Sequence, residues 1–225
     1  MIRVYTVLMV VLALCAGSHS AAAQAVTDQT LMVNKAANTI ERLRSDPNMQ
    51  ANIVTLLPRA RAVLIVPDLV KGGFILGGQY GTGILLARTR DGRWSGPAFY
   101  SVASGSLGLQ IGLQDSETLY IIMSDGGLMA IMNDRMKLGA DAGVALVVIG
   151  AGGEASTTTN GGADIYAFQS AVGLYGGVSL QGSGILPRES WNAAYYGASV
   201  SPEDIVVGGR VDSRQANRLR DLLAR

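Results

Sequence analysis

Cysteine and histidine, the side chains that most often carry chemistry in proteins, are nearly absent from this 225-residue chain. The chain has one of each, Cys15 and His19, and both lie close to its N-terminus. Cys–His pairs, Ser-His-Asp triads and His/Cys zinc sites all need these side chains, so residues 20–225 lack the parts for them. Most common classes of hydrolase and metalloenzyme are therefore excluded, and we expect no catalytic residue, no metal and no cofactor.

A carboxylate or a lysine is the remaining route to chemistry. Asp141 lies in a glycine-rich expected strand, where a carboxylate can have a perturbed pKa. No second carboxylate stands at a spacing typical of an acid–base pair, so we interpret Asp141 as a buried, hydrogen-bonded structural residue. An enzyme that works through Asp141 or a lysine is kept as the third of three functional alternatives.

One stretch imitates a dinucleotide-binding motif. Residues 147–155 (VVIGAGGEA) match G-x-G-x-x-A after an apolar run. That motif needs a helix to begin at the turn, so that the helix N-terminus meets the pyrophosphate. The next residues, 156–162 (STTTNGG), do not favour a helix, and no acidic residue follows near position 170 to bind a ribose. We reject this interpretation.

The N-terminus has the pattern of a targeting segment. Arg3 precedes an apolar run over residues 4–16, and the small residues Ala21 and Ala23 fit the −3 and −1 positions of a cleavage site. We expect export to the periplasm, removal of residues 1–23 and one domain over residues 24–225; an uncleaved leader is the alternative. Lipoprotein anchoring through Cys15 fits less well, because Leu12 is bulky where such sites take a small residue.

Glycines dominate one face of the expected central strands. In residues 71–85, Gly73, Gly77, Gly81 and Gly83 share a face, and residues 104–113 alternate leucine or isoleucine with small residues. Glycine weakens a strand, so a run of glycines on one face implies a close neighbour. That neighbour is a bent barrel wall, another strand or a ligand, and the first is the ordinary reason for glycine in strands.

Helical periodicity appears at both ends of the chain. Apolar residues recur at helical spacing over residues 26–45 and again over 212–224, and a short helix is expected after Asp125. Several strands lie between them, two joined by an Asp91-Gly92 turn. The predicted fold class is α+β: a strongly bent antiparallel sheet or partial β-barrel, with helices at the N-terminus, at the C-terminus and one between strands.

Seven blocks in series resemble the SYLF family, also called the Ysc84 actin-binding domain family. They are residues 60–67 (ARAVLIVP), 71–78 (KGGFILGG), 94–99 (WSGPAF), 105–112 (GSLGLQIG), 137–142 (KLGADA), 173–180 (GLYGGVSL) and 192–197 (NAAYYG). The resemblance covers roughly residues 30–200 and extends to exported bacterial members with a leader and a single domain. It implies phospholipid binding, mainly to phosphorylated headgroups in eukaryotic members, with actin association in some members and no enzyme activity.

The resemblance has one departure. Where the family often has Gly-Pro-x-Gly-Arg after the block at 137–142, this chain has Ala151 at the arginine position. If that turn binds an anion in relatives, anion binding is weaker in this chain. Actin is not an expected partner of an exported bacterial protein.

The first functional hypothesis is therefore a non-enzymatic domain of the cell envelope that binds an anionic phospholipid or a membrane surface. Arginine suits bidentate phosphate contacts and lysine acts as a point charge, while Trp94, Tyr195 and Tyr196 suit an interface. The candidate headgroup ligands are Arg59, Arg61, Lys71, Arg88, Lys137 and Trp94.

The alternative is a structural or protein-interaction domain of the envelope with no lipid ligand. Such a domain would use an exposed apolar patch or the basic face of the last helix to bind an envelope protein. A formal net charge of only +1 gives no reason to expect nucleic acid as a partner.

Overall fold

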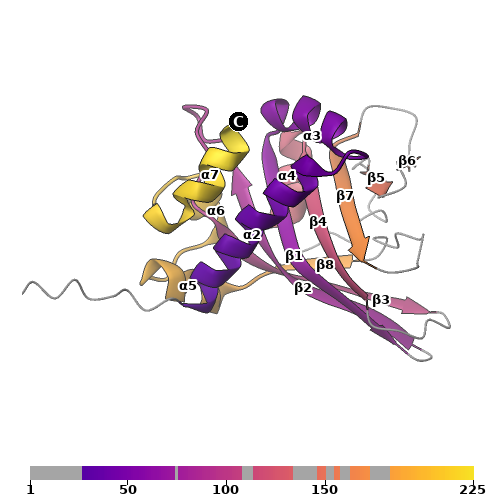
Figure 1. Ribbon diagram of the computed structural model, residues 1–225. Helices are drawn as coiled ribbons and strands as arrows, with labels where there is room; N and C mark the ends of the chain where they lie inside the picture. Colours follow the sequence, from indigo (N-terminus) through magenta and orange to yellow (C-terminus); the bar gives the residue numbers. More distant parts are fainter. Residues whose placement is uncertain are drawn as a thin grey trace, which may run out of the picture.

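One curled sheet of eight strands organises the chain (Figure 1). The computed structural model describes residues 27–73, 76–107, 114–133, 146–150, 155–157, 163–172 and 183–225. The expected leader, Lys137, Asp141 and Ala151 lie outside these ranges. The strands are β1 (Ala62–Gly73), β2 (Leu76–Ala87), β3 (Ala98–Leu107), β4 (Gln114–Ile122), β5 (Leu146–Gly150), β6 (Ala155–Thr157), β7 (Ile165–Val172) and β8 (Ser183–Pro187).

The strand order is β6-β5-β7-β4-β1-β2-β3-β8. Every neighbouring pair is antiparallel except β5 and β7, which are parallel. The α+β class with a strongly bent, mainly antiparallel sheet is confirmed, and the parallel pair is an addition to the prediction.

Glycine allows the sheet to curl at β2. A Cβ atom on Gly81 would lie 2.7 Å from the carbonyl oxygen of Asp68, and one on Gly83 would lie 2.8 Å from Leu64 Cδ1. Both close neighbours belong to β1, which changes register between Ile65 and Leu69. For Gly81 and Gly83 the neighbour is therefore the bent wall of the sheet itself.

Helices cover both faces of the sheet. On one face lie α2 (Asp28–Ser45), α3 (Gln50–Leu56), α5 (Glu189–Tyr196) and α7 (Asn217–Ala224), with the short 3-10 turns η1 (Leu57–Arg59) and η2 (Arg214–Ala216). On the other lie α4 (Asp125–Met132) and α6 (Pro202–Val206). In Figure 1, α2 and α7 lie in front of the sheet, and β2 and β3 run on past them. The predicted terminal helices and the helix between strands are confirmed.

The longest helix among the described residues, α2, follows the predicted apolar spacing. Thr27 caps it by accepting a hydrogen bond from the backbone N–H of Thr30 at 3.2 Å. Its buried apolar residues are Val33, Ala36, Ala37, Ile40 and Leu43. No helix within the described ranges combines the length and apolar character needed to cross a membrane.

Candidate functional site

Five arginines gather where β1 begins and β2 ends. Arg59 ends η1, Arg61 precedes β1, and Arg88 begins the β2–β3 connection. We call the group Arg59, Arg61, Arg88, Arg90 and Arg93 the arginine end. The backbone ties its two halves together, because the N–H of Arg88 donates to the carbonyl oxygen of Arg61 at 2.8 Å.

The β2–β3 connection is a rigid platform for three of these arginines. Arg88 and Trp94 form an antiparallel bridge, and the N–H of Thr89 donates to the carbonyl oxygen of Arg93 at 2.8 Å. The turn closes at Gly92, whose φ of +79° is one that glycine adopts without strain. The predicted Asp-Gly turn is confirmed.

Arg61 and Arg88 are positioned by several contacts each. Arg61 Nε donates to Asp125 Oδ1 at 2.5 Å, and its Nη1 donates to the carbonyl oxygen of Arg88. The guanidinium of Arg88 lies 4.2 Å from the ring centroid of Trp94, and its Nη1 donates to the carbonyl oxygen of Gly92 at 2.9 Å. Burial lowers the pKa of Arg88, but an arginine still carries its charge at neutral pH.

The arginine end carries an excess of positive charge. The carboxylates that pair with its members are Asp125, bound by Arg61, and Asp91, bound by Arg93 at 2.5 Å. The Thr89 hydroxyl donates a hydrogen bond to Asp91, and Arg93 donates a second; together they lower the pKa of Asp91 to about 2, so this carboxylate is charged at neutral pH. Asp212 also interacts electrostatically with Arg93 but is itself paired with Arg220. Among the described residues, five arginines against two paired carboxylates therefore leave an excess of three charges, which suits an anion.

The predicted basic residues do not all meet. The structure brings Arg59, Arg61 and Arg88 together, whereas Lys71 lies near the far end of β1, in register with Gln79 and Gln114. Ten residues of strand separate Lys71 from Arg61, a distance of about 30 Å. Lys71 therefore lies apart from the arginine end. Sequence analysis left out Arg90 and Arg93, although the Asp91-Gly92 turn between them was a signal that both lie at a hairpin tip.

Of the predicted aromatic contacts, Trp94 lies in the core, and Tyr195 and Tyr196 are partly buried against it. Trp94 is only 5% exposed, which leaves it a supporting position beneath Arg88. Tyr196 Oη donates to the carbonyl oxygen of Pro97 at 2.9 Å, and burial raises its pKa. A Cβ on Gly96 would lie 2.4 Å from that hydroxyl oxygen, so the motif at 94–99 requires glycine there for packing.

The block at 192–197 packs against the block at 94–99, where α5 meets β3. Asn192 in α5 is fully buried, and its Oδ1 accepts a hydrogen bond from the backbone N–H of Phe99 at 2.8 Å. The ring of Tyr195 packs edge-on against Phe99, with centroids 5.2 Å apart. The blocks at 94–99 and 192–197 therefore fasten α5 to β3, which partly buries Tyr195 and Tyr196.

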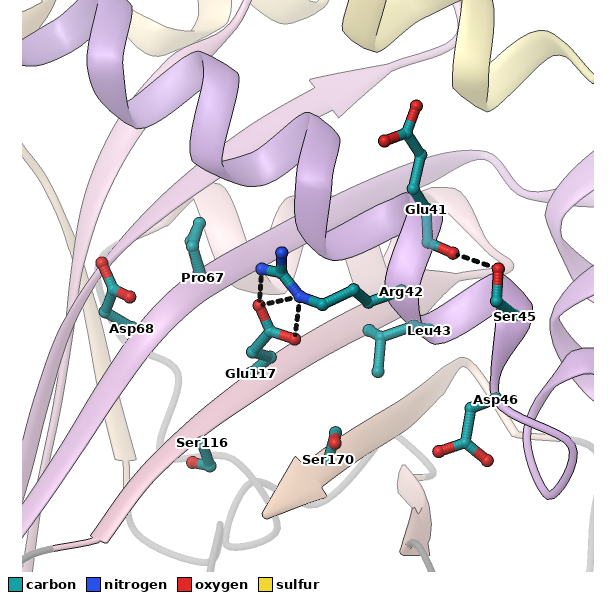
Figure 2. A pocket seen from close by; sticks show the side chains of 10 residues that line it. All are labelled: Glu41, Arg42, Leu43, Ser45, Asp46, Pro67, Asp68, Ser116, Glu117 and Ser170. Carbon is teal, nitrogen blue, oxygen red and sulfur yellow. Dashed lines mark hydrogen bonds and ion pairs between the residues drawn. The ribbon is translucent and has the colours of Figure 1, made fainter. Parts of the chain in front are cut away.

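A separate hollow of about 620 Å³ lies between the C-terminal half of α2 and the sheet (Figure 2). Figure 2 shows Arg42 and Glu117 pointing toward one another across it. Arg42 Nε donates to Glu117 Oε2 at 2.9 Å, and the buried hydroxyl of Thr39 donates to Glu117 Oε1 at 2.7 Å. Its lining is Glu41, Arg42, Leu43, Ser45, Asp46, Pro67, Asp68, Ser116, Glu117 and Ser170.

The lining of this hollow is acidic. Four carboxylates stand against a single arginine, so the hollow is a poor site for a phosphate. Sequence analysis did not predict it, because its carboxylates come from α2, the turn after α2, β1 and β4, which are distant in the sequence. It contains none of the predicted headgroup ligands.

Comparisons with known proteins give one consistent result. A family model described as "Ysc84: Las17-binding protein actin regulator" matches residues 103–225. The chain is 30% identical over 159 residues to "Protein YSC84" of Saccharomyces cerevisiae, covering 69% of this chain and 34% of that protein. It is 30% identical over 161 residues to "SH3 domain-containing YSC84-like protein 1" of Rattus norvegicus, covering 71% and 47%. The matched region therefore spans a third to a half of each relative.

Proposed function

The chain belongs to the Ysc84 family, and from that premise we propose that it is a non-enzymatic domain that binds an anionic phospholipid or membrane surface through the arginine end. The family is described as a Las17-binding protein and actin regulator, and a yeast relative is called "LAS seventeen-binding protein 3". Neither description is that of an enzyme. We further propose that the protein acts at the cell envelope after export and removal of residues 1–23.

The excess charge of the arginine end is the observation that carries this proposal. Arg59, Arg90 and Arg93 are exposed, and Arg61 and Arg88 lie between them on a fixed backbone. Near an anionic bilayer each cationic side chain contributes about 1 kcal/mol, so three excess charges favour anionic over neutral lipid by about 3 kcal/mol, or roughly a hundredfold.

Apolar side chains flank the same end. Val54 in α3 is 47% exposed and lies five residues before Arg59. Met129 in α4 is 46% exposed and lies one turn after Asp125, the partner of Arg61. Arginines flanked by exposed apolar groups suit the boundary between headgroups and acyl chains.

Vesicle co-sedimentation tests the proposal. We expect binding to vesicles that contain phosphatidylglycerol, weak binding to pure phosphatidylcholine, and loss of the difference at high salt. Replacing the three exposed arginines (Arg59→Gln, Arg90→Gln and Arg93→Gln) should weaken binding. Equal, negligible sedimentation with both vesicles would refute the proposal.

A matched control removes the same charge elsewhere. Lys35, Arg42 and Arg218 are exposed on α2 and α7, where they pair with carboxylates outside the arginine end, Asp68, Glu117 and Glu41 respectively. Their triple replacement by glutamine should leave vesicle binding nearly unchanged. An equal loss in both triple variants would mean that net charge, and not the arginine end, governs binding.

A protein-interaction domain is the second candidate. The family description names a Las17-binding protein and actin regulator, and "LAS seventeen-binding protein 3" of Saccharomyces cerevisiae is one of the relatives. The expectation that actin is no partner rests on the leader alone, and neither the structure nor the comparisons support it. Co-sedimentation with actin filaments, without lipid, would favour this candidate over the first.

A further inference from the structure

The guanidinium group of Arg61 is held in place by the backbone. Its Nη1 donates to the carbonyl oxygen of Arg88, and the side chain is 27% exposed. That carbonyl group is itself fixed where β1 meets β2, because the N–H of Arg88 donates to the carbonyl oxygen of Arg61 at 2.8 Å. The Nη1 contact therefore orients the guanidinium group independently of any carboxylate.

The Nε–Nη2 edge of an arginine is suited to phosphate. Two N–H bonds leave this edge in the same direction, so they match two oxygens of a carboxylate or a phosphate. Arg42 shows this use, because both its Nε and its Nη2 donate to the carboxylate of Glu117 (Figure 2). On Arg61 the same edge is contacted by Asp125, whose Oδ1 accepts from Nε at 2.5 Å.

Asp125 fills this edge less completely than Glu117 fills that of Arg42. Among the described residues, Arg61 donates to Asp125 through Nε alone, and its Nη2 donates to none. The Asp125 side chain is 79% exposed, whereas that of Glu117 is 20% exposed and also accepts from the Thr39 hydroxyl. An exposed ion pair with one contact adds little stability, because water and salt screen it. Replacing Asp125 by another anion therefore costs little.

Asp125 keeps a favourable position after such a replacement. It is the first residue of α4, and Ser124 caps that helix by accepting a hydrogen bond from the backbone N–H of Gly127 at 3.0 Å. The helix dipole stabilises a carboxylate at this end, and water solvates its exposed oxygens. Asp125 therefore needs no contact with Arg61 to remain charged.

The other carboxylate paired at the arginine end, Asp91, is fixed within its own turn. It accepts hydrogen bonds from the Thr89 hydroxyl and from Arg93 Nε, and all three residues belong to the β2–β3 connection. Asp125 instead comes from α4, and Arg61 is its only side-chain hydrogen-bond partner among the described residues. Asp125 can therefore leave without disturbing the turn.

We propose that Asp125 is a displaceable counter-ion on the phosphate-binding edge of Arg61, and that a phosphate group takes its place when the ligand binds. The inference rests on the proposed function, in which the arginine end binds an anionic phospholipid, and it adds the group that is exchanged. Arg61 then contacts the phosphate directly, and Asp125 lowers the affinity of the site for anions.

Asp125→Asn tests the exchange, with Asp28→Asn as its control. Asparagine has the shape of aspartate without the charge, so it leaves the edge of Arg61 to the phosphate. Asp28 is exposed in the first turn of α2, so the control removes the same charge from the same kind of helix position. The 18 residues of α2 span about 27 Å, and its other end leads to α3 and Arg59.

Vesicle co-sedimentation with phosphatidylglycerol gives the affinities. At about 1 kcal/mol for each charge near an anionic bilayer, we expect Asp125→Asn to bind roughly fivefold more tightly than the parent, and Asp28→Asn to bind like the parent. If Asp125→Asn binds no more tightly than the parent, or if both variants gain equally, the inference is overturned and the proposed function is left intact. Absence of binding by all three proteins overturns both.

The Arg61→Gln background separates exchange from simple repulsion. Because Asp125 acts by occupying Arg61, the gain from Asp125→Asn should be lost when Arg61→Gln is already present. A gain of the same size in both backgrounds shows that Asp125 only repels the ligand, which overturns the inference.

Titration of the same variants with inorganic phosphate identifies the source of the phosphate group. A gain for vesicles alone assigns a lipid headgroup, and a gain for both probes assigns phosphate in either form. Both of these results support the exchange, whereas a gain for neither probe overturns it.

Discussion

Replacing Gly81 with alanine tests how β2 curves against β1. The added Cβ would lie 2.7 Å from the carbonyl oxygen of Asp68, 2.8 Å from Val66 Cγ1 and 3.2 Å from Leu69 Cδ1. The first contact is backbone, so a rotamer change cannot relieve it. Overpacking of this kind costs about 1–3 kcal/mol, and the lower chain entropy of alanine returns about 0.4–1 kcal/mol.

We therefore expect Gly81→Ala to lower the free energy of unfolding by about 1–2 kcal/mol, or about 2–8 °C in Tm for a chain of this size. The matched control is Gly184→Ala in β8, where the added Cβ would meet only the carbonyl oxygen of Ala103 at 3.8 Å. That variant should be as stable as the parent, or more stable by up to about 1 kcal/mol.

Urea denaturation followed by circular dichroism, with thermal melts of the same samples, measures both variants. The slope of unfolding free energy against urea should stay constant, so that the midpoint reports stability. If Gly81→Ala is as stable as Gly184→Ala, the interpretation of Gly81 as part of a tightly curled wall is wrong, and that position would again be open to a ligand.

Three further predictions concern the interior. Asn192→Ala should lower the unfolding free energy by about 1–3 kcal/mol, because it leaves the buried N–H of Phe99 without its acceptor; chemical denaturation measures this, and an unchanged midpoint would contradict it. Glu117→Ala should cost about 1–3 kcal/mol because the buried Thr39 hydroxyl loses its acceptor, whereas Glu117→Gln, which keeps an oxygen there, should cost less in the same assay. Burial raises the pKa of Tyr120 and Tyr196 above the ordinary value of 10. Above pH 10 these phenols ionise in the unfolded chain but stay neutral in the folded chain. The stability that they contribute is therefore fully present below pH 10 and is lost as the pH rises above it. Urea midpoints between pH 8 and 11 check this, and a flat profile would show that these phenols are accessible.

Local pattern was enough to predict much of the fold. The apolar spacing of residues 26–45 predicts the buried face of α2, because helical periodicity depends only on neighbours along the chain. The Asp91-Gly92 pair likewise predicts a turn, since positive φ is a local requirement.

Features that depend on pairing between distant segments were not predicted. Whether β5 and β7 run parallel depends on the path of the chain that connects them. The alternation of apolar and polar residues within a strand does not reveal that path. The same reason explains the acidic hollow, whose carboxylates meet only after α2 packs on the sheet.

The candidate site was predicted in part. Arg59, Arg61 and Arg88 meet because β1 and β2 are antiparallel, so the start of one strand lies beside the end of the other. Lys71 is on the same strand as that group but near the opposite end of it, which a list of basic residues does not reveal. Trp94, Tyr195 and Tyr196 resemble interface residues by type, but Trp94 is buried, and Tyr195 and Tyr196 are partly buried by packing against Phe99 and Gly96.

The most direct test of the central proposal is the affinity of the Arg59→Gln, Arg90→Gln, Arg93→Gln variant for phosphatidylglycerol vesicles, measured beside the parent and the Lys35, Arg42, Arg218 control. At about 1 kcal/mol for each charge, we predict roughly hundredfold weaker binding for the first variant and little change for the control. Parent-like binding by the first variant would contradict the assignment of the arginine end as the membrane contact.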